Sequence, residues 1–404
     1  MPQWLPALWG AAPTATPKPI TTELRLATWP VSAAVDDYFQ ERVAAYQQIE
    51  PETQVEVTLL PNYATRLRTA LESETPPDVV RVNAFLVPDL VAKGLLAPLP
   101  PSLMAQADLS PLLQQMGAVD GTAYCLPQDA NTLALLYNRT LFDAAQVAYP
   151  TVDWTWETLR TTAEQLTDTS TGLYGMVLPA DFSRWLPFLY QAGGAVMDST
   201  ALSMTLTSSA ATTALQFYSD LVVDGVAAPP TTLGNSWAGD AFAQGHAAMV
   251  IEGNWLIPYL AETAATLDYG VVALPAGPGG KATVAFVNCY AIAAGTAQAL
   301  AASHLIEFLT NPESQRQWLP LTAALPARMA LLDTWLLAYP AQSTFAQELA
   351  IAHPWQFRAG FQPVVDVIND GLQQIYGGFV LPASVLAEAD AIGNERLQNQ
   401  QNQP

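Results

Sequence analysis

The start of the chain alternates between strand-like and helix-like apolar patterns, and no other feature of the sequence limits the fold as much. Strand patterns lie at residues 23–29, 54–60 and 78–82, and helix patterns follow them at 36–50, 63–73 and 85–93. This β-α-β-α-β-α order is typical of an α/β fold with a largely parallel sheet and helices on both faces. Because ligands of such sheets bind at the carboxyl ends of the strands, Trp29, Tyr63 and Asn83 become candidates for a site.

The length of the chain favours two lobes, because 404 residues are more than one hydrophobic core usually serves. Two apolar strand patterns, at 122–127 and 132–138, flank the polar segment 128–131, which we interpret as a crossing between lobes. Later elements are expected as helices at 156–166, 208–224, 237–244 and 298–309 and as strands at 248–251, 269–274 and 283–292. The polar last residues, 394–404, are expected to fray.

The charge balance excludes several classes of partner. The chain carries 36 acidic and 15 basic residues, which gives a net charge of −21. A protein that binds nucleic acid needs a basic face, so no nucleic acid is expected as a partner. An anionic membrane surface is disfavoured for the same reason. No apolar run reaches the roughly 18 residues of a membrane-spanning helix.

Residues 1–21 do not have the pattern of a folded domain, because prolines at positions 2, 6, 13, 17 and 19 block regular structure. We interpret the segment as the remnant of a signal peptide or as a Pro/Thr-rich spacer that tethers a secreted protein, as in a lipoprotein. A start without any role is the alternative. A complete signal peptide and a Cys for lipid attachment are not seen in this segment.

The residue types that carry most enzyme chemistry are sparse. The three His are scattered, and no metal-ligand spacing, nucleophile elbow or phosphate-binding loop is present. We therefore expect no catalytic residue, no metal and no cofactor. Asp129, Asp181 and Glu252 leave one alternative open, a secreted glycan-active hydrolase that uses paired carboxylates. Some of the 36 acidic residues will, however, approach one another by chance.

Cys125 and Cys289 are the two cysteines of the chain. Their number and spacing fit neither a disulfide framework nor a zinc site. From the residues alone, two buried free thiols are the commoner outcome, and one disulfide is the alternative in an oxidising compartment.

Several segments carry more information than composition does. Residues 242–255 are FAQGHAAMVIEGNW, residues 269–275 are YGVVALP, and residues 302–318 contain FLTNPESQ. Shorter segments of the same kind are PDVV at 77–80, LLYN at 135–138 and GLYG at 172–175. The ordered set resembles the extracellular solute-binding proteins of ABC importers, the family that includes the maltose-binding protein, over about residues 22–375.

The resemblance implies a two-lobe periplasmic-binding-protein-like fold, in which the ligand lies in a cleft between lobes joined by crossing hinge segments. Lobe 1 is then expected at 22–127 and 291–322, lobe 2 at 131–287 and 326–404, and the hinge segments at 128–130, 286–290 and 321–326. Since Cys125 and Cys289 lie near these crossings, the resemblance also brings them close enough to pair.

The resemblance further implies a sugar or oligosaccharide as ligand. Sugars need aromatic rings for their C–H faces and carboxylate or amide groups for their hydroxyls. Residues of these types at the expected cleft positions are Trp29, Tyr63, Asn83, Asp129, Phe182, Trp185, Trp237, Trp255, Asn288 and Trp355. For Trp29 and Trp185, a place in a lobe core is the alternative. Only Arg81 and Arg184 lie near the strand ends, so glycerol phosphate or a polyol is the less favoured ligand.

As a member of such a family, the chain is expected to be an extracytoplasmic monomer, periplasmic or tethered to the cell surface. It would deliver its ligand to the transmembrane subunits of an ABC permease, and a sensor is the alternative partner.

Overall fold

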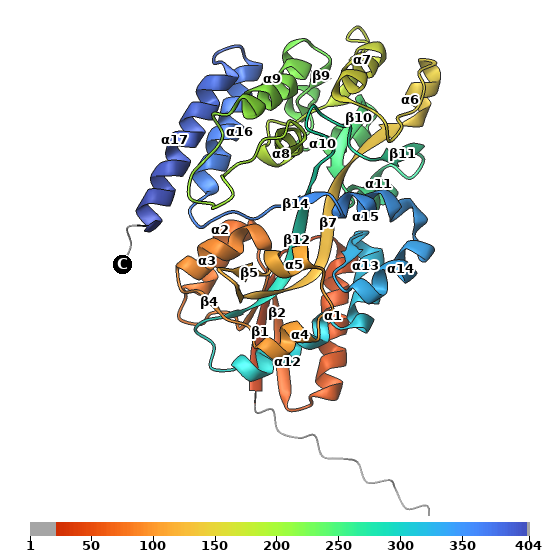
Figure 1. The fold of residues 1–404 in the computed structure, drawn as a ribbon. Coiled ribbons are helices and arrows are strands. Elements are labelled where there is room, and N and C mark those ends of the chain that lie inside the picture. The colour runs from red at the N-terminus through yellow and green to blue at the C-terminus, as the bar shows by residue number, and fades with distance from the viewer. Residues whose placement is uncertain (1–21, 402–404) are drawn as a thin grey trace, which may run out of the picture.

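Two α/β lobes, one above the other in Figure 1, make up residues 22–401, the part of the chain that the computed structural model describes. The expected spacer at 1–21 lies outside the described residues. The two lobes confirm the fold that the sequence predicts.

Three parallel strands start the lower lobe, which we call lobe 1. β1 (Thr22–Thr28) pairs with β2 (Thr53–Leu59) on one side and with β3 (Val79–Asn83) on the other. α1 (Ala33–Ile49) and α2 (Tyr63–Leu71) connect them. Shorter elements follow: η1 (Ala84–Leu86), α3 (Val87–Ala92), β4 (Leu96–Ala97), α4 (Pro101–Ala105), α5 (Pro111–Met116), β5 (Ala118–Val119) and β6 (Thr122–Ala123). The alternating pattern at the start of the sequence therefore predicts this part of the fold correctly.

Two long antiparallel strands run through both lobes. β7 (Cys125–Asn138) pairs with β12 (Thr283–Ala293), and together they join the sheet of lobe 1, through β3, to that of lobe 2. The prediction that 128–131 separates two strands is wrong, because β7 is one continuous strand of 14 buried residues. Its polar residues are tolerated there because distant side chains satisfy them.

The upper lobe, which we call lobe 2, continues the sheet in the order β7-β10-β8-β9, and β11 pairs with β7. Its strands are β8 (Tyr174–Val177), β9 (Ala227–Ala228), β10 (Ala247–Gly253) and β11 (Tyr269–Val272). Its helices are α6 (Arg139–Ala144), α7 (Trp156–Leu166), α8 (Phe182–Gln191), α9 (Ser209–Val223), η2 (Pro230–Leu233), α10 (Ala238–Ala243) and α11 (Leu256–Thr263). Within β7, Leu133 and Leu135 face one core and Ala134 and Leu136 the other, as the twofold period of a strand requires.

The chain passes between the lobes a third time near its end. α12 (Ala299–Leu309) and α13 (Pro312–Thr322) lie in lobe 1, and β13 (Leu325–Pro326) pairs with β7. The elements that follow are α14 (Met329–Ala338), η3 (Pro340–Gln342), α15 (Ser343–Leu349), β14 (Ala352–Pro354), α16 (Gln362–Tyr376) and α17 (Pro382–Gln401).

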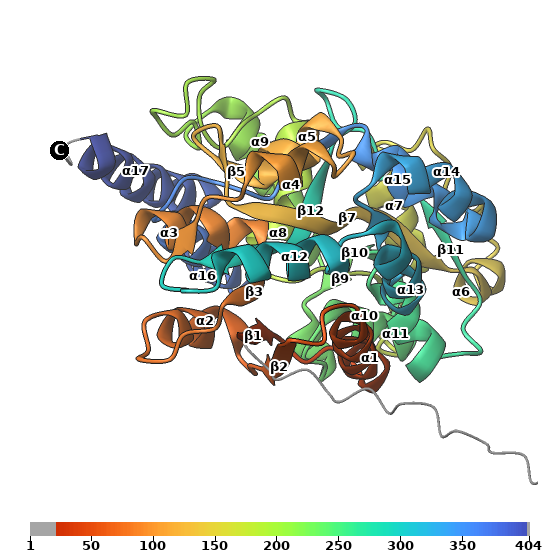
Figure 2. The same cartoon turned by 90° about the horizontal axis from the view of Figure 1, so that it is seen from below.

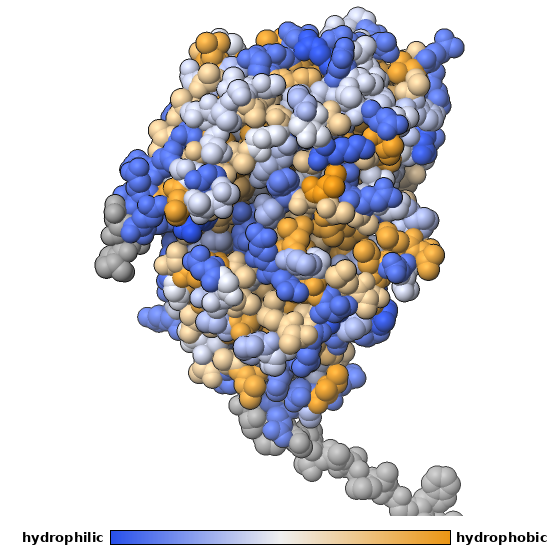
Figure 3. All heavy atoms as spheres, viewed as in Figure 1, coloured by the Kyte–Doolittle hydropathy of each residue, from blue (hydrophilic) through white to orange (hydrophobic). Residues whose placement is uncertain are grey.

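Figure 3 shows apolar residues over the region of α14 and α15, where Met329 and Leu337 are exposed.

The polar C-terminal end does not fray over its described part, so that prediction is wrong for residues 394–401. They continue α17, and Leu397 is buried. The Asn394 side chain accepts a hydrogen bond from the Met204 amide, which ties α17 to the loop before α9. These tertiary contacts stabilise a helix whose own sequence is polar.

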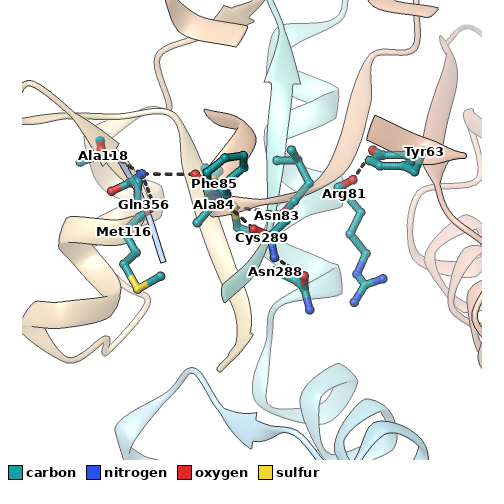
Figure 4. Close-up of a disulfide and its surroundings, with 12 residues drawn as sticks. Tyr63, Arg81, Asn83, Ala84, Phe85, Met116, Ala118, Asn288, Cys289 and Gln356 are labelled. Atoms are coloured by element: carbon teal, nitrogen blue, oxygen red, sulfur yellow. Dashed lines mark hydrogen bonds between the residues drawn. A yellow bond between two sulfur atoms is a disulfide. The ribbon is translucent and has the colours of Figure 1, made fainter. Parts of the chain in front are cut away.

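Cys125 and Cys289 form a disulfide, with their Cα atoms 5.5 Å apart. The bond joins β7 to β12 at the lobe 1 end of the crossing, between Cys125 of lobe 1 and Cys289 in the expected hinge segment 286–290. Figure 4 shows the surroundings of Cys289, with Asn288 beside it and Gln356 donating hydrogen bonds to backbone carbonyls of lobe 1. Of the two outcomes that the sequence leaves open, the structure has the disulfide.

Candidate functional site

A cavity of about 340 Å³ opens between the lobes. Its floor is formed by the crossing strands. Its walls come from the loop between β1 and α1 and from α13 in lobe 1, and from Trp237, which precedes α10, and α11 in lobe 2. Seen from below in Figure 2, α10 and α11 of lobe 2 overlap in projection with α1 of lobe 1, and Figure 1 shows them in opposite lobes. The polar and aromatic lining residues are Trp29, Ser32, Arg81, Asp129, Asn131, Trp237, Trp255, Tyr259, Glu262, Asn288, Trp318 and Thr322.

The wall in lobe 1 is built around the buried Arg81 of β3. Its guanidinium carbon lies 3.9 Å from the ring centre of Trp29 and 4.5 Å from that of Trp318, so it sits between two indoles. Nε donates to the Gln128 side chain at 2.8 Å. Nη1 has no partner within the described residues, although Arg81 lines the cavity. A buried donor without a partner is costly, so Arg81 favours a ligand that carries an acceptor.

Asp129 balances the charge of Arg81 on the floor of the cavity. Arg81 Nη2 lies 3.6 Å from Oδ2, which also accepts from Trp318 Nε1 at 2.8 Å. Oδ1 accepts from Asn131 Nδ2 at 3.1 Å and from Asn288 Nδ2 at 3.0 Å. Burial raises the pKa of Asp129, while Arg81 and the three hydrogen bonds act against that increase. The carboxylate thus orients two amides that line the cavity, and Figure 4 shows Asn288 and the Arg81 guanidinium directed to the same side of the sheet.

The wall in lobe 2 has a second buried ion pair. Arg184 Nη2 donates to both oxygens of Glu252, at 2.8 and 2.7 Å. The same carboxylate accepts from Trp237 Nε1 at 3.1 Å and from Trp255 Nε1 at 2.9 Å. Burial acts to lower the pKa of Arg184, but Glu252 and Asp181 outweigh it, so that this pKa lies above its ordinary value. Both indoles line the cavity, whereas the ion pair lies behind them.

Five of the ten residues expected in the cleft line this cavity: Trp29, Asp129, Trp237, Trp255 and Asn288. Tyr63 and Asn83 lie one layer behind. The Tyr63 ring centre is 5.0 Å from that of Trp29, and Tyr63 donates its hydroxyl to the Arg81 carbonyl. The Asn83 amide lies 3.4 Å from the Asn288 side chain.

Phe182, Trp185 and Trp355 do not line the cavity. Phe182 and Trp185 have no exposed surface, because the apolar face of α8 packs into the core of lobe 2. Trp355 is half-buried and stacks on Phe85, with ring centres 5.0 Å apart. For Phe182 and Trp185 we therefore replace the expectation of cleft contact by a place in the core of lobe 2. For Trp355 we replace it by packing against Phe85 and Phe286 outside the cavity. For Trp185, the core position was the alternative that the sequence left open.

Asn131, Tyr259 and Trp318 line the cavity but are not among the site residues expected from the sequence, and Arg81 is expected only as a nearby charge. A signal exists for two of them. Arg81 interrupts an otherwise apolar buried strand, and a buried charge needs a partner. Asn131 follows Asp129 by two residues, so both point to one face of β7. No local pattern marks Trp318, whose partner Asp129 is 189 residues away in the sequence.

Within residues 22–401, no three His, Cys, Asp or Glu side chains lie together as metal ligands would. No helix in this described part is long and apolar enough to cross a membrane.

Two lobes joined by three passages, with a polar and aromatic cavity between them, define a binding protein of the two-lobe class. A family model described as bacterial extracellular solute-binding protein matches residues 29–316. The chain belongs to this family, which confirms the resemblance found in the sequence.

Relatives with similar sequences cover nearly the whole chain. A protein of Brucella abortus, described only as a binding protein, is 24% identical over 92% of this chain and 93% of its own length. A protein of Brucella suis with the same kind of name matches equally well.

Solved structures share the fold at similar identity. An ABC substrate-binding protein from Listeria monocytogenes, in complex with cycloalternan, has a TM-score of 0.85 at 23% identity and covers 93% of this chain and 99% of its own. The GacH receptor of Streptomyces glaucescens, solved without ligand and with acarbose, has a TM-score of 0.83 at 23% identity, covering 95% and 99%. A solute-binding protein of Thermotoga lettingae bound with α-D-tagatose has a TM-score of 0.82 at 23% identity. The match covers 93% of this chain and 100% of its own.

Proposed function

We propose that this protein captures an uncharged sugar or short oligosaccharide in the cavity between its lobes and delivers it to the permease of an ABC importer outside the cytoplasm. The observation that carries the proposal is the composition of the cavity walls. Indole rings of Trp237 and Trp255 stand on one side, and the Arg81 guanidinium and the amides of Asn131 and Asn288 stand on the other.

These groups match the two surfaces of a sugar ring. A pyranose presents C–H groups on its faces, which pack on aromatic rings, and hydroxyls on its rim, which need donors and acceptors. Lobe 2 offers the rings. In lobe 1 the guanidinium of Arg81 covers one face of Trp29, so this wall offers mainly hydrogen-bonding groups. The cavity of about 340 Å³ lies in the range typical of small-molecule sites.

The charges in the site favour a neutral ligand. Arg81 is paired with Asp129 and Arg184 with Glu252, so neither guanidinium leaves a net positive charge in the cavity. Glu262 on the lining adds a negative charge. A phosphorylated ligand needs uncompensated Arg or Lys, which makes glycerol phosphate the less favoured ligand.

The solved relatives support the ligand class. Their structures hold cycloalternan, acarbose and α-D-tagatose, and a further one with a TM-score of 0.78 is a cyclo/maltodextrin-binding protein with maltotetraose.

A hydrolase is the second candidate, and the state of the carboxylates argues against it. A glycosidase needs one carboxyl that gives a proton and one that attacks or activates water. Asp129 and Glu252 instead accept hydrogen bonds from indoles and are each paired with an Arg, which leaves neither free for a sugar oxygen. We propose that the protein binds its ligand without changing it, as a monomer.

A thermal-shift screen tests the proposal. The purified protein is melted with mono- and oligosaccharides, with glycerol 3-phosphate as the charged contrast. A ligand present at about 100 times its Kd stabilises the folded state by about 2.7 kcal/mol, which gives a clear rise in Tm. Stabilisation by glycerol 3-phosphate and by no saccharide would overturn the ligand class. Chromatography of the bound sugar after long incubation separates a binder, which returns it intact, from a hydrolase.

A further inference from the structure

One buried carboxylate holds both indoles of the lobe 2 wall. Glu252, at the end of β10, has no exposed surface. Its Oε1 accepts from Trp237 Nε1 at 3.1 Å, and its Oε2 accepts from Trp255 Nε1 at 2.9 Å and from the Gly253 amide at 3.2 Å. Arg184 donates to both oxygens and balances the charge. The carboxylate therefore has no oxygen left for a ligand, and its hydrogen bonds are directed to the rings that line the cavity.

Each indole also rests on a glycine. A Cβ built on Gly239 would collide with the six-membered ring of Trp237, and one built on Gly253 would collide with that of Trp255. Neither glycine has a positive φ, so the backbone conformation does not require glycine at either position. What requires it is the close approach of the ring.

A second aromatic ring packs against the edge or face of each indole. Trp237 meets Tyr259 with ring centres 4.8 Å apart and an angle of 77°, and Trp255 meets Phe286 at 5.4 Å and 86°. Each indole is thus fixed at its nitrogen by Glu252, below by a glycine and at the side by another ring. Both indoles therefore have the same three kinds of contact, although Trp237 precedes α10 and Trp255 precedes α11.

We propose that Glu252 is a positioning residue that fixes Trp237 and Trp255 relative to each other, so that a saccharide meets one rigid pair of rings. The inference rests on the proposed function for its effect on binding, but the geometry of the two rings does not depend on the ligand. Its consequence is coupling. If Glu252 holds both rings, loss of the hydrogen bond to one indole also changes how the other indole binds the saccharide. This effect is expected to disappear once Glu252 is replaced.

The first test needs no ligand. Indole N–H resonances of ¹⁵N-labelled protein are recorded for the wild type and for Glu252→Gln, and Trp237→Phe and Trp255→Phe assign the two signals. A charge-assisted hydrogen bond shifts an N–H resonance downfield. We expect both signals to move upfield in Glu252→Gln while that of Trp29 stays in place. Unchanged Trp237 and Trp255 signals would overturn the inference and leave the proposed function intact.

The matched control is Glu164→Gln on α7, where the carboxylate accepts from Arg160 Nε at 3.0 Å on the surface of the same lobe. It makes the same chemical change next to an Arg, and all indole signals are expected to stay in place.

If Glu252→Gln does not fold, Gly239→Ala and Gly253→Ala replace it. Each adds one methyl group under one ring, and each is expected to shift the signals of both indoles if Glu252 couples them. A shift confined to the ring above the new methyl group would contradict the coupling.

The second test uses maltotetraose as the probe in titration calorimetry. We expect Glu252→Gln to bind it at least ten-fold more weakly than wild type. Trp237→Phe is expected to cost several-fold in Kd in the wild-type background and little in the Glu252→Gln background. Equal costs in both backgrounds would overturn the coupling. If maltotetraose does not bind the wild type, the ligand is wrong, and the resonances alone decide the role of Glu252.

Discussion

At the scale of single residues, the two walls of the cavity share one arrangement. In each wall, a buried carboxylate is paired with an Arg and accepts hydrogen bonds from indole Nε1 groups, which orients the indoles. Asp129 does this for Trp318, and Glu252 does it for Trp237 and Trp255. Burying a charge pair costs desolvation, and the hydrogen bonds that complete its coordination offset part of that cost. Loss of an indole is therefore expected to reduce mainly the affinity for the ligand, and loss of a buried carboxylate mainly the stability of the fold.

Trp255 is expected to matter mainly for affinity. Trp255→Ala removes an aromatic platform and should weaken saccharide binding by about 1–3 kcal/mol. The side chain is half-buried and lines the cavity, so the melting temperature should fall only moderately, by the loss of one hydrogen bond to the buried Glu252. Titration calorimetry with the best saccharide of the screen measures the loss, and an affinity equal to that of wild type would remove Trp255 from the site.

Asp129 is expected to matter more for stability. Asp129→Asn keeps the shape but leaves Arg81 as a buried charge without its counter-ion, and breaking such a pair costs about 3–5 kcal/mol. Denaturant unfolding should therefore show a marked loss of stability. The affinity of the folded fraction should fall by about 1–3 kcal/mol, because Asn offers one neutral acceptor oxygen where Asp129 offers two charged ones, so Asn131, Asn288 and Trp318 are oriented less strongly. Wild-type stability together with weaker binding would mean that Asp129 contacts the sugar directly.

At the scale of elements, the sequence predicts the alternating strands and helices of lobe 1 because their apolar periods are local. It fails at residues 128–131, where polar residues are typical of a loop but lie inside β7. Gln128 and Asp129 find their partners in β3, β12 and α13, all distant in sequence. Prediction of the site residues is limited in the same way, because it too uses only local sequence. Phe182 and Trp185 have the residue types of a sugar site, and a core buries such residues equally well, so composition does not separate the two roles.

The packing of α15 on β7 gives a pH dependence that can be tested. Glu348 of α15 is 3% exposed, and one of its oxygens has no partner within the described residues. Burial raises its pKa to about 7, against the opposing effects of the Leu274 amide and Lys281. The folded protein therefore binds this proton more tightly than the unfolded chain does, and stability falls as pH rises from about 4.5 to about 7.

The comparison of wild type with Glu348→Gln isolates this effect. The variant carries no charge at this position, so its stability relative to wild type should increase by up to about 3 kcal/mol between pH 4.5 and pH 8. Urea unfolding of both proteins at the two pH values measures the difference. A difference that does not change with pH would show that Glu348 is ionised throughout, with a partner that the folded state supplies.

At the scale of the whole molecule, three chain passages join the lobes, through β7, β12 and the segment that contains β13. We propose hinges at 128–130, 286–290 and 321–326, with lobe 1 at 22–127 and 291–322 and lobe 2 at 131–287 and 326–401; the expected extension of lobe 2 to 404 lies outside the described residues. A ligand that contacts both walls of the cavity binds the closed arrangement better and shifts the population towards it.

Small-angle X-ray scattering tests this closure. The radius of gyration should fall when the saccharide is added at saturation, because the lobes approach each other around it. Trp255→Ala at the same saccharide concentration is the control and should show a smaller change, since less of the protein is occupied. A radius that stays the same at full occupancy, verified by calorimetry on the same sample, would mean that the lobes are already fixed.

The order of strands in the sheet has a consequence for how the chain is made. β12 lies between β3 and β7, so the edge of β3 stays without its neighbour until residues 283–293 have been synthesised, about 200 residues after β3 itself. The second cysteine of the disulfide arrives with the same strand. Since an open strand edge invites pairing with other chains, a nascent chain of this protein remains exposed to aggregation until strands β8 to β11 of lobe 2 have been translated. Lobe 1 therefore begins first in the sequence but cannot be completed before much of lobe 2 has been made.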